Sequence, residues 1–197
     1  MPKAVTEEEL HQICEALRKN YSEKLQRGHC REGEIIWHVP MFWFALYTGL
    51  RASELARLRW GSIDFDKRLI YIRVQKNKKE QTIPLNKKAA EVLEEVSQGE
   101  SEDYVFRSPG FTARNRSINT FRSDISRTFT RYRRLAGIQR KVTLHGTRHG
   151  HCTLLAEHGK PAYVIQASAR HADISTSMRY VHIANEHLKA ELDDVFS

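Results

Sequence analysis

A short stretch of alternating residues interrupts a chain whose other apolar positions recur every three or four residues. Along residues 69–74 two sets of side chains alternate, Leu69, Tyr71 and Arg73 against Ile70, Ile72 and Val74. A period of two is typical of a β-strand. A second extended run covers residues 81–85, and polar residues 77–79 lie between the two, which predicts a β-hairpin or small antiparallel sheet. We expect a first strand over residues 62–65 to precede them.

The apolar positions outside this stretch favour helices. The longest stripe follows three- and four-residue steps through Ile118, Phe121, Ile125, Phe129 and Tyr132, as on one face of an α-helix. Near the N-terminus, Thr6 and Glu9 are expected to form a capping box ahead of another helix. Shorter helices are expected near residues 40–47, 53–58, 86–96, 145–158, 161–169, 174–182 and 185–195. The sequence therefore predicts one α+β domain, mostly α-helical with one small antiparallel β-sheet.

Basic residues gather in the middle of the chain. The formal net charge is +8, and residues 107–141 hold many Arg and Lys but a single acid, Asp124, whereas clustered acids lie toward both ends. A basic stripe of this kind fits a face that binds nucleic acid.

Cysteine usage and hydropathy limit the compartment. Three widely spaced cysteines, Cys14, Cys30 and Cys152, argue against a disulfide framework and favour a reducing environment. No apolar run reaches the ~18–20 residues that a bilayer span requires, and the N-terminus lacks the basic-then-apolar order of a signal peptide. We expect a cytoplasmic protein with no membrane partner.

Two arginines, two histidines and a late tyrosine occur in three motifs. Arg51 lies in TGLRASEL, His145 and Arg148 lie in HGTRH, and His171 and Tyr180 lie in RHADISTSMRYVH. Two guanidinium groups can hold the non-bridging oxygens of one phosphate. A tyrosine can act as a covalent nucleophile, and histidines can transfer protons. The set predicts cleavage of a phosphodiester by nucleophilic attack without a metal.

These motifs resemble those of the tyrosine recombinases, also called the phage integrase family, and the resemblance covers nearly all 197 residues. It implies the catalytic-domain fold of that family over residues 1–197, and a site-specific recombinase that cleaves and rejoins DNA without a cofactor. It also implies a set of catalytic residues, namely Arg51, Lys76, His145, Arg148, His171 and the nucleophile Tyr180.

The resemblance implies a role for each of these residues. Arg51, Arg148 and His171 would clamp the scissile phosphate. Lys76, on the hairpin in VQKNKKEQTIPL, would protonate the leaving 5′ oxygen, and Tyr180 would form a 3′-phosphotyrosyl link. His145 would assist the deprotonation of Tyr180.

Several of these residues also have plainer interpretations. Arg51 can be a surface or capping arginine, but Glu54, three residues later, is expected to orient it through an ion pair. Lys76 can be a simple phosphate contact. His149 is interpreted as buried structure behind the site. No metal site is expected, because HGTRH lacks the glutamate of HExxH and no Cys-x-x-Cys lies nearby.

The residues before His171 depart from the family pattern. The family usually has Leu-Gly at this point, and this chain has Ala169 and Arg170. Because glycine permits a tight turn, the local backbone is expected to differ, and Arg170 is expected to add a phosphate contact. The full set of expected DNA contacts outside the catalytic residues is Lys78, Lys79, Arg122, Arg131, Arg134 and Arg170.

Double-stranded DNA is the expected partner, which would associate the protein with the nucleoid. The resemblance implies a homotetramer on DNA, with the tail over residues 186–196 docked between protomers, and a monomer in free solution. The tail can instead pack on its own domain. Family members usually carry an N-terminal helical DNA-binding domain, and we expect this chain to lack it, as either an excised catalytic domain or a minimal protein. Two other functions stay open, a type IB topoisomerase and a non-catalytic DNA-binding module.

Overall fold

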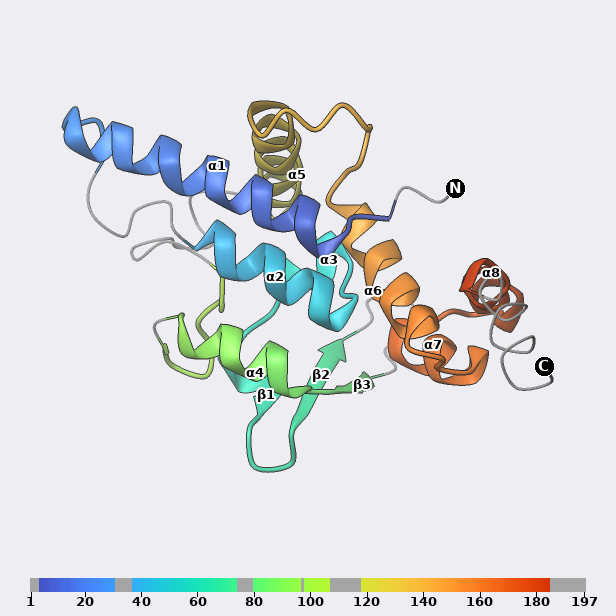
Figure 1. Ribbon diagram of the computed structural model, residues 1–197. Helices are drawn as coiled ribbons and strands as arrows, with labels where there is room; N and C mark the ends of the chain where they lie inside the picture. The colour runs from blue at the N-terminus through green and yellow to red at the C-terminus, as the bar shows by residue number, and fades with distance from the viewer. Residues whose placement is uncertain (1–3, 31–36, 74–79, 97, 107–117, 185–197) are drawn as a thin grey trace.

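The computed structural model describes residues 4–30, 37–73, 80–96, 98–106 and 118–184 (Figure 1). Within these residues helices predominate and three short strands form one antiparallel sheet, so the predicted fold class is confirmed. The elements are α1 Glu7–Gln26, α2 His38–Thr48, α3 Ala52–Leu55, a 3-10 helix Trp60–Ser62, β1 Ile63–Asp64, β2 Leu69–Arg73, β3 Glu80–Pro84, α4 Lys87–Glu94, α5 Ile118–Leu135, α6 His145–Glu157, α7 Ala162–Ala169 and α8 Ile174–Ala184.

Helix α2 forms the centre of the fold. Its sequence, HVPMFWFALYT, is apolar on nearly every face, and α1, α4 and α6 pack around it. A helix without a polar stripe must be covered on all sides. Gly49 ends α2 in the left-handed conformation, with φ of 64°. A Cβ atom at this position would lie 2.8 Å from Cδ2 of His151, so the glycine allows the end of α2 to approach α6 closely.

Helices α1 and α5 pack against each other beside α2 (Figure 1). The capping box at the start of α1 is confirmed, since Thr6 accepts from the Glu9 N–H and Glu9 accepts from the Thr6 N–H. The apolar stripe of α5 is also confirmed. Phe129 is fully buried and contacts Phe42 of α2 edge-on, with ring centroids 5.1 Å apart. Phe42 and Phe129 belong to the larger of two groups of buried apolar side chains, which includes residues of α1, α2, α5 and the sheet and which we call the large core.

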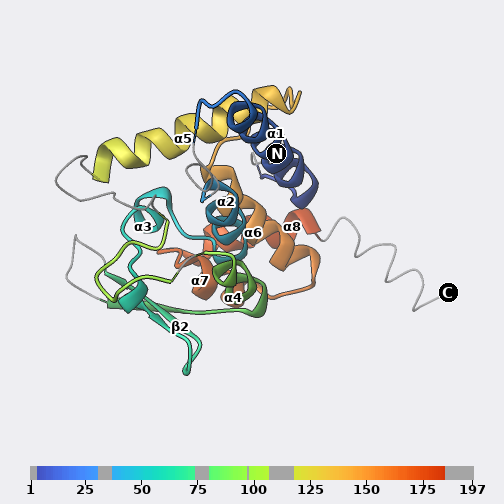
Figure 2. The ribbon, with the colours of Figure 1, turned by 90° about the vertical axis from the view of Figure 1, so that its left-hand side faces the viewer.

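The sheet has the order β1-β2-β3 with antiparallel pairing. Ile70 of β2 pairs with Ile63 on one side and Ile83 on the other, and all three side chains are buried. In both views the sheet lies at the opposite end of the molecule from α1 (Figures 1 and 2). The predicted hairpin is thus confirmed for its strands, while residues 74–79 lie outside the described part of the chain.

Helices α6, α7 and α8 pack on one another at one side of the molecule (Figure 1). They enclose a second, smaller apolar group that we call the Tyr180 cluster: Cys152, Ala156, Ile165, Ala169 and Tyr180. The left-handed Gly159, with φ of 68°, separates α6 from α7. The functional motifs of the C-terminal half therefore meet around a core of their own.

Candidate active site

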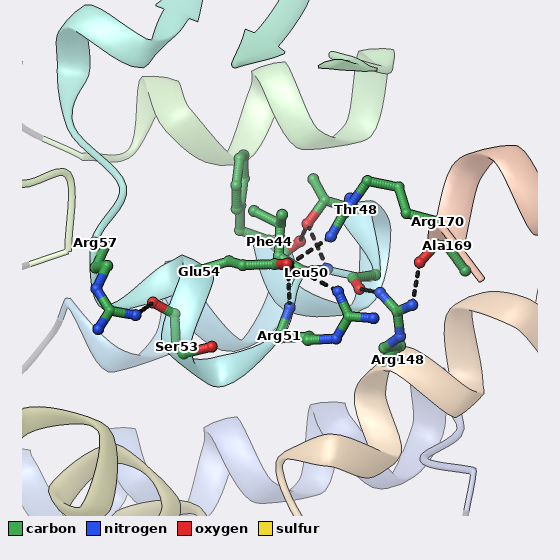
Figure 3. Close-up of polar contacts among 11 residues, drawn as sticks. Phe44, Thr48, Leu50, Arg51, Ser53, Glu54, Arg57, Arg148, Ala169 and Arg170 are labelled. Atoms are coloured by element: carbon green, nitrogen blue, oxygen red, sulfur yellow. Dashed lines mark hydrogen bonds and ion pairs between the residues drawn. The ribbon is translucent and has the colours of Figure 1, made fainter. Parts of the chain in front are cut away.

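Arg148 joins three segments at the centre of the site. Its side chain extends from α6 to two backbone carbonyls. Nη1 donates to the Gly49 carbonyl at 2.7 Å, and Nη2 donates to the Ala169 carbonyl (Figure 3). The residue is only 4% exposed. Burial, with Arg51 and Arg170 nearby, lowers the pKa of Arg148 to about 10. The guanidinium therefore stays charged at neutral pH, although nearby cations disfavour that charge.

Arg51 is held by Glu54 but remains open to solvent. Its Nη1 lies 3.0 Å from Glu54 Oε1, and its backbone N–H donates to Glu54 Oε2 at 2.8 Å. The Arg51 side chain is 45% exposed, whereas the Glu54 side chain is largely covered. The contacts have the geometry expected of a carboxylate that orients an arginine. Burial opposes ionisation of Glu54, but Arg170 and Arg51 hold its pKa below the ordinary value.

Tyr180 lies on α8, is 6% exposed, and contacts a histidine of α6. The phenolic oxygen lies 2.5 Å from Nδ1 of His149. Burial and the neighbouring Cys152 raise the pKa of Tyr180 to about 12, so the phenol is protonated at neutral pH. Burial and the neighbouring His145 and Arg148 lower the pKa of His149, so its imidazole is neutral there and can accept a proton.

This contact differs from the expectation drawn from the sequence. The family resemblance implied that His145 assists Tyr180, and His149 was interpreted as structure behind the site. In the structure His145 is exposed at the start of α6 and packs edge-on against His149, with ring centroids 5.0 Å apart. His149 is the ring that touches the phenol. The spacing of His149 and Cys152, three residues apart, places both on one face of α6, and this face borders Tyr180.

His171 lies on the other side of Tyr180. The two rings are nearly parallel, at 10°, with centroids 6.2 Å apart, and Nδ1 of His171 lies 2.9 Å from Oγ of the fully buried Ser177. Burial, with Arg148 and Arg51 nearby, lowers the pKa of His171 to about 4. The structure thus brings five of the six predicted catalytic residues to one region, and Lys76 lies outside the described residues.

The turn before His171 keeps the backbone that a glycine would adopt. Arg170 has φ of 54° and ψ of 49°, in the left-handed region. Glycine adopts this region without strain, whereas an arginine rarely does. Its side chain turns inward to Glu54, with Nη2 and Oε2 2.5 Å apart, and is only 5% exposed (Figure 3). The structure does not place Arg170 at a DNA-facing surface, because the ion pair with Glu54 holds its side chain inside the protein.

The other expected DNA contacts fall into two groups. Arg122, Arg131 and Arg134 are exposed on α5, outside its buried apolar stripe. Lys78 and Lys79 lie outside the described residues. Within the described residues no cluster of three His, Cys, Asp or Glu side chains has the arrangement of a metal site. No helix in the same residues is long and apolar enough to cross a membrane.

His151 is a buried residue of α6 that sequence reasoning did not assign. Its Nδ1 lies 3.0 Å from the Leu46 carbonyl, and its Nε2 lies 2.7 Å from Oγ of Ser168. Burial lowers its pKa to about 4. The neutral ring therefore links α2, α6 and α7 and fixes the helix that carries Arg148 and His149.

Comparison with known proteins identifies the family of this chain. The model of the phage integrase family matches residues 3–187. The chain belongs to this family, whose members include the tyrosine recombinases. Tyrosine recombinase XerA of Pyrococcus furiosus is 30% identical over 197 residues, covering 98% of this chain and 62% of that protein. Tyrosine recombinase XerD of Proteus mirabilis is 33% identical over 183 residues, covering 88% of this chain and 56% of that protein.

Solved structures show the same fold. The crystal structure of XerA recombinase superposes with a TM-score of 0.67 at 24% identity, covering 100% of this chain and 65% of the other. XerH site-specific recombinase, bound to palindromic difH substrate, also gives a TM-score of 0.67, at 18% identity, covering 97% of this chain and 52% of the other. The chain therefore has the catalytic-domain fold of the tyrosine recombinases and spans between half and two thirds of the length of these proteins.

Proposed function

We propose that this protein is a site-specific DNA recombinase in which Tyr180 is the nucleophile. The observation that carries the proposal is the contact between the Tyr180 hydroxyl and Nδ1 of His149, next to Arg148. A phenol with a pKa of about 12 needs a base in order to attack at neutral pH. A neutral imidazole within hydrogen-bond distance supplies that base.

In the cleavage step one proton leaves the attacking oxygen of Tyr180 and another reaches the leaving 5′ oxygen of the DNA. The Tyr180 O–H bond breaks and its proton passes to Nδ1 of His149, while the phenolic oxygen forms a bond to phosphorus. The bond from phosphorus to the 5′ oxygen breaks, and that oxygen takes a proton from Lys76. The product is a 3′-phosphotyrosyl link and a free 5′ hydroxyl. A 5′ hydroxyl from a partner duplex then attacks the phosphorus and gives its proton to Lys76. The bond from phosphorus to the Tyr180 oxygen breaks, and that oxygen takes its proton back from His149, so rejoining requires no further energy source.

The scissile phosphate binds between Arg51 and Arg148, with His171 as an additional donor. Arg51 is partly open to solvent, whereas Arg148 is buried and its two terminal nitrogens are fixed on backbone carbonyls. The pKa of Arg148 is lowered by burial and by its cationic neighbours. An anion in this region relieves that repulsion, and its charge is stabilised further as it grows in the transition state.

Double-stranded DNA is the proposed substrate. Two solved structures with the same fold are complexes with DNA, XerH recombinase with difH substrate and a lambda integrase dimer with a COC′ core site. The exposed Arg122, Arg131 and Arg134 of α5 support phosphate contacts along the duplex, and Lys78 and Lys79 are further proposed contacts. We propose further that the protein is a monomer in free solution and forms a homotetramer on DNA, with the tail docked between protomers. Its proposed location is cytoplasmic and associated with the nucleoid.

The test is capture of the covalent intermediate on a nicked suicide duplex, which loses the leaving strand after cleavage. A pool of such duplexes is incubated with the protein, and the adduct is measured on a denaturing gel. The parent should form an adduct, and Tyr180→Phe should form none while binding duplex DNA as before, because only the phenolic oxygen is lost.

Tyr163→Phe is the matched control, since Tyr163 is 66% exposed on α7 and should be dispensable. An adduct in Tyr180→Phe would identify another nucleophile. Absence of an adduct in the parent, together with duplex binding, would instead favour a non-catalytic DNA-binding module.

A further inference from the structure

Arg170 occupies a backbone conformation that favours glycine and is unfavourable for an arginine. Among the described residues, Arg68 and Arg170 are the two non-glycine positions with positive φ, at 53° and 54°. A side chain in this region brings its Cβ close to the backbone, which costs free energy. Arg68 is exposed in the turn between β1 and β2, whereas Arg170 lies between α7 and His171.

The Arg170 side chain carries two further costs. It is 95% buried, since its exposed fraction is 5%, and burial of a cation removes its hydration. Its Nη2 pairs with Glu54, but its Nε and Nη1 are buried without a hydrogen-bond partner. Unpaired buried donors are unfavourable. Costs of this kind persist where the surrounding structure holds the residue in place for a function.

The contacts of Glu54 show what the arginine acts on. Oε2 of Glu54 receives both Nη2 of Arg170 and the backbone N–H of Arg51, and Oε1 receives Nη1 of Arg51 (Figure 3). The carboxylate is therefore shared between two guanidinium groups. Its negative charge is divided between them, so Arg51 keeps part of its positive charge for another anion.

The residues beside Arg170 hold the rest of the phosphate-binding set. The carbonyl of Ala169 accepts from Arg148, and His171 follows directly and contacts Ser177. The turn over residues 169–171 thus touches Arg148 through its backbone, Arg51 through Glu54, and supplies His171 itself. A change in the position of this turn moves all three groups.

We infer that Arg170 is a positioning residue for strand cleavage, which shares the Glu54 carboxylate with Arg51 and thereby keeps Arg51 oriented and available to the scissile phosphate. This inference rests on the proposed function. Without Arg170, Glu54 pairs with Arg51 alone, and the resulting neutral pair attracts phosphate weakly. The catalytic residues are then still present, but the charged group around Glu54 no longer has a net positive charge.

The first test compares single-turnover adduct formation at saturating nicked duplex. Arg170→Met keeps the bulk of the side chain without its charge and should slow cleavage at least tenfold. Arg170→Lys keeps a charge that can reach Glu54 and should recover most of the rate. Arg68→Gly is the matched control, because it relieves the same backbone conformation away from the site, and it should cleave as the parent does.

A double-mutant cycle tests whether Arg170 acts through Glu54. The effects of Arg170→Met and Glu54→Gln on the cleavage rate should not multiply. Removal of the carboxylate also removes the charge that neutralises Arg51. The double variant should cleave no more slowly than Arg170→Met alone. Cleavage by Arg170→Met within twofold of the parent, equal loss in Arg170→Lys and Arg170→Met, or multiplicative effects would each overturn the inference.

A measurement without DNA separates this inference from the proposed function. The Glu54 carboxyl is titrated by carbon NMR in the parent and in Arg170→Met, and its pKa should rise when Arg170 is removed. An unchanged titration overturns the coupling of Arg170 to Glu54. If the parent itself forms no adduct, the proposed function fails, and the titration alone decides whether the coupling exists.

Discussion

The large core and the Tyr180 cluster are built from different chemistry. The large core is packed with fully buried aromatic and aliphatic side chains from α1, α2, α5 and the sheet. The Tyr180 cluster is small, and its surroundings include buried polar groups such as Arg148, His151 and Ser177. Apolar packing determines the fold, whereas satisfied polar contacts hold a reactive group in one orientation. A substitution should therefore affect stability in the first region and reactivity in the second.

Removal of a ring from the large core should have the largest effect on stability. Phe129→Ala deletes a fully buried ring that contacts Phe42, and it should lower the free energy of unfolding by about 3–5 kcal/mol. Chemical denaturation measures this change. Phe65→Ala is the matched control, since Phe65 is 44% exposed and should cost much less. A rate of cleavage per folded molecule that fell with Phe129→Ala would contradict the separation of the two regions.

A conservative change beside the Tyr180 cluster should instead abolish most of the activity. Arg148→Lys keeps a charge but cannot hold two carbonyls and a phosphate with one planar fork. We expect adduct formation to slow at least about 100-fold, or ~2.7 kcal/mol in the barrier. Arg133→Lys is the control, because Arg133 is also buried and bonds the Arg140 carbonyl, but lies on α5. If Arg148→Lys slowed adduct formation by less than about tenfold, the planar guanidinium of Arg148 would not be essential for holding the phosphate.

Acid should weaken the region around α6 before it weakens the large core. The pKa of His151 is about 4 in the folded protein, compared with ~6.5 in the unfolded chain. The unfolded state therefore binds more protons between these values, and stability is lost as pH falls from about 6.5 toward 4. His171 has the same sign, with a folded pKa of about 4.

Denaturation across this pH range tests the histidine contribution. His151→Gln should make the free energy of unfolding depend less steeply on pH. The stability lost between about pH 6.5 and 4 should shrink by roughly 1.4 kcal/mol for each unit of pKa shift that the substitution removes. His11→Gln, at an exposed position of α1, should leave the slope unchanged. An equal slope in the parent and His151→Gln would show that the buried ring titrates normally.

The sequence predicted the large core better than it predicted the contacts of the Tyr180 cluster. The α5 stripe, the β2–β3 pair and the Thr6 cap are local patterns, and each is present. The choice between His145 and His149 is different, because it depends on how α8 packs against α6, across 31 residues of chain. Local spacing placed both histidines near the site, but only the packing selects the one that faces the phenol.

Arg170 illustrates a second limit of sequence reasoning. An arginine where a glycine is usual suggested a changed backbone and a DNA contact, because side chains in the left-handed region are unfavourable. In the structure the turn at Arg170 is left-handed, and the side chain points to Glu54, 116 residues earlier in the chain. A long-range ion pair of this kind leaves no periodic pattern in the sequence.

The central claim is that Tyr180 transfers its proton to His149 as it attacks. The most direct measurement is the single-turnover rate of adduct formation by His149→Ala, with and without added imidazole. The variant should cleave at least about 100-fold more slowly than the parent, because a phenol with a pKa of about 12 has lost its base. Imidazole should restore part of the rate in His149→Ala and none in Tyr180→Phe. Cleavage by His149→Ala at the parent's rate would contradict the claim, as would loss of activity that imidazole restores in His145→Ala but not in His149→Ala.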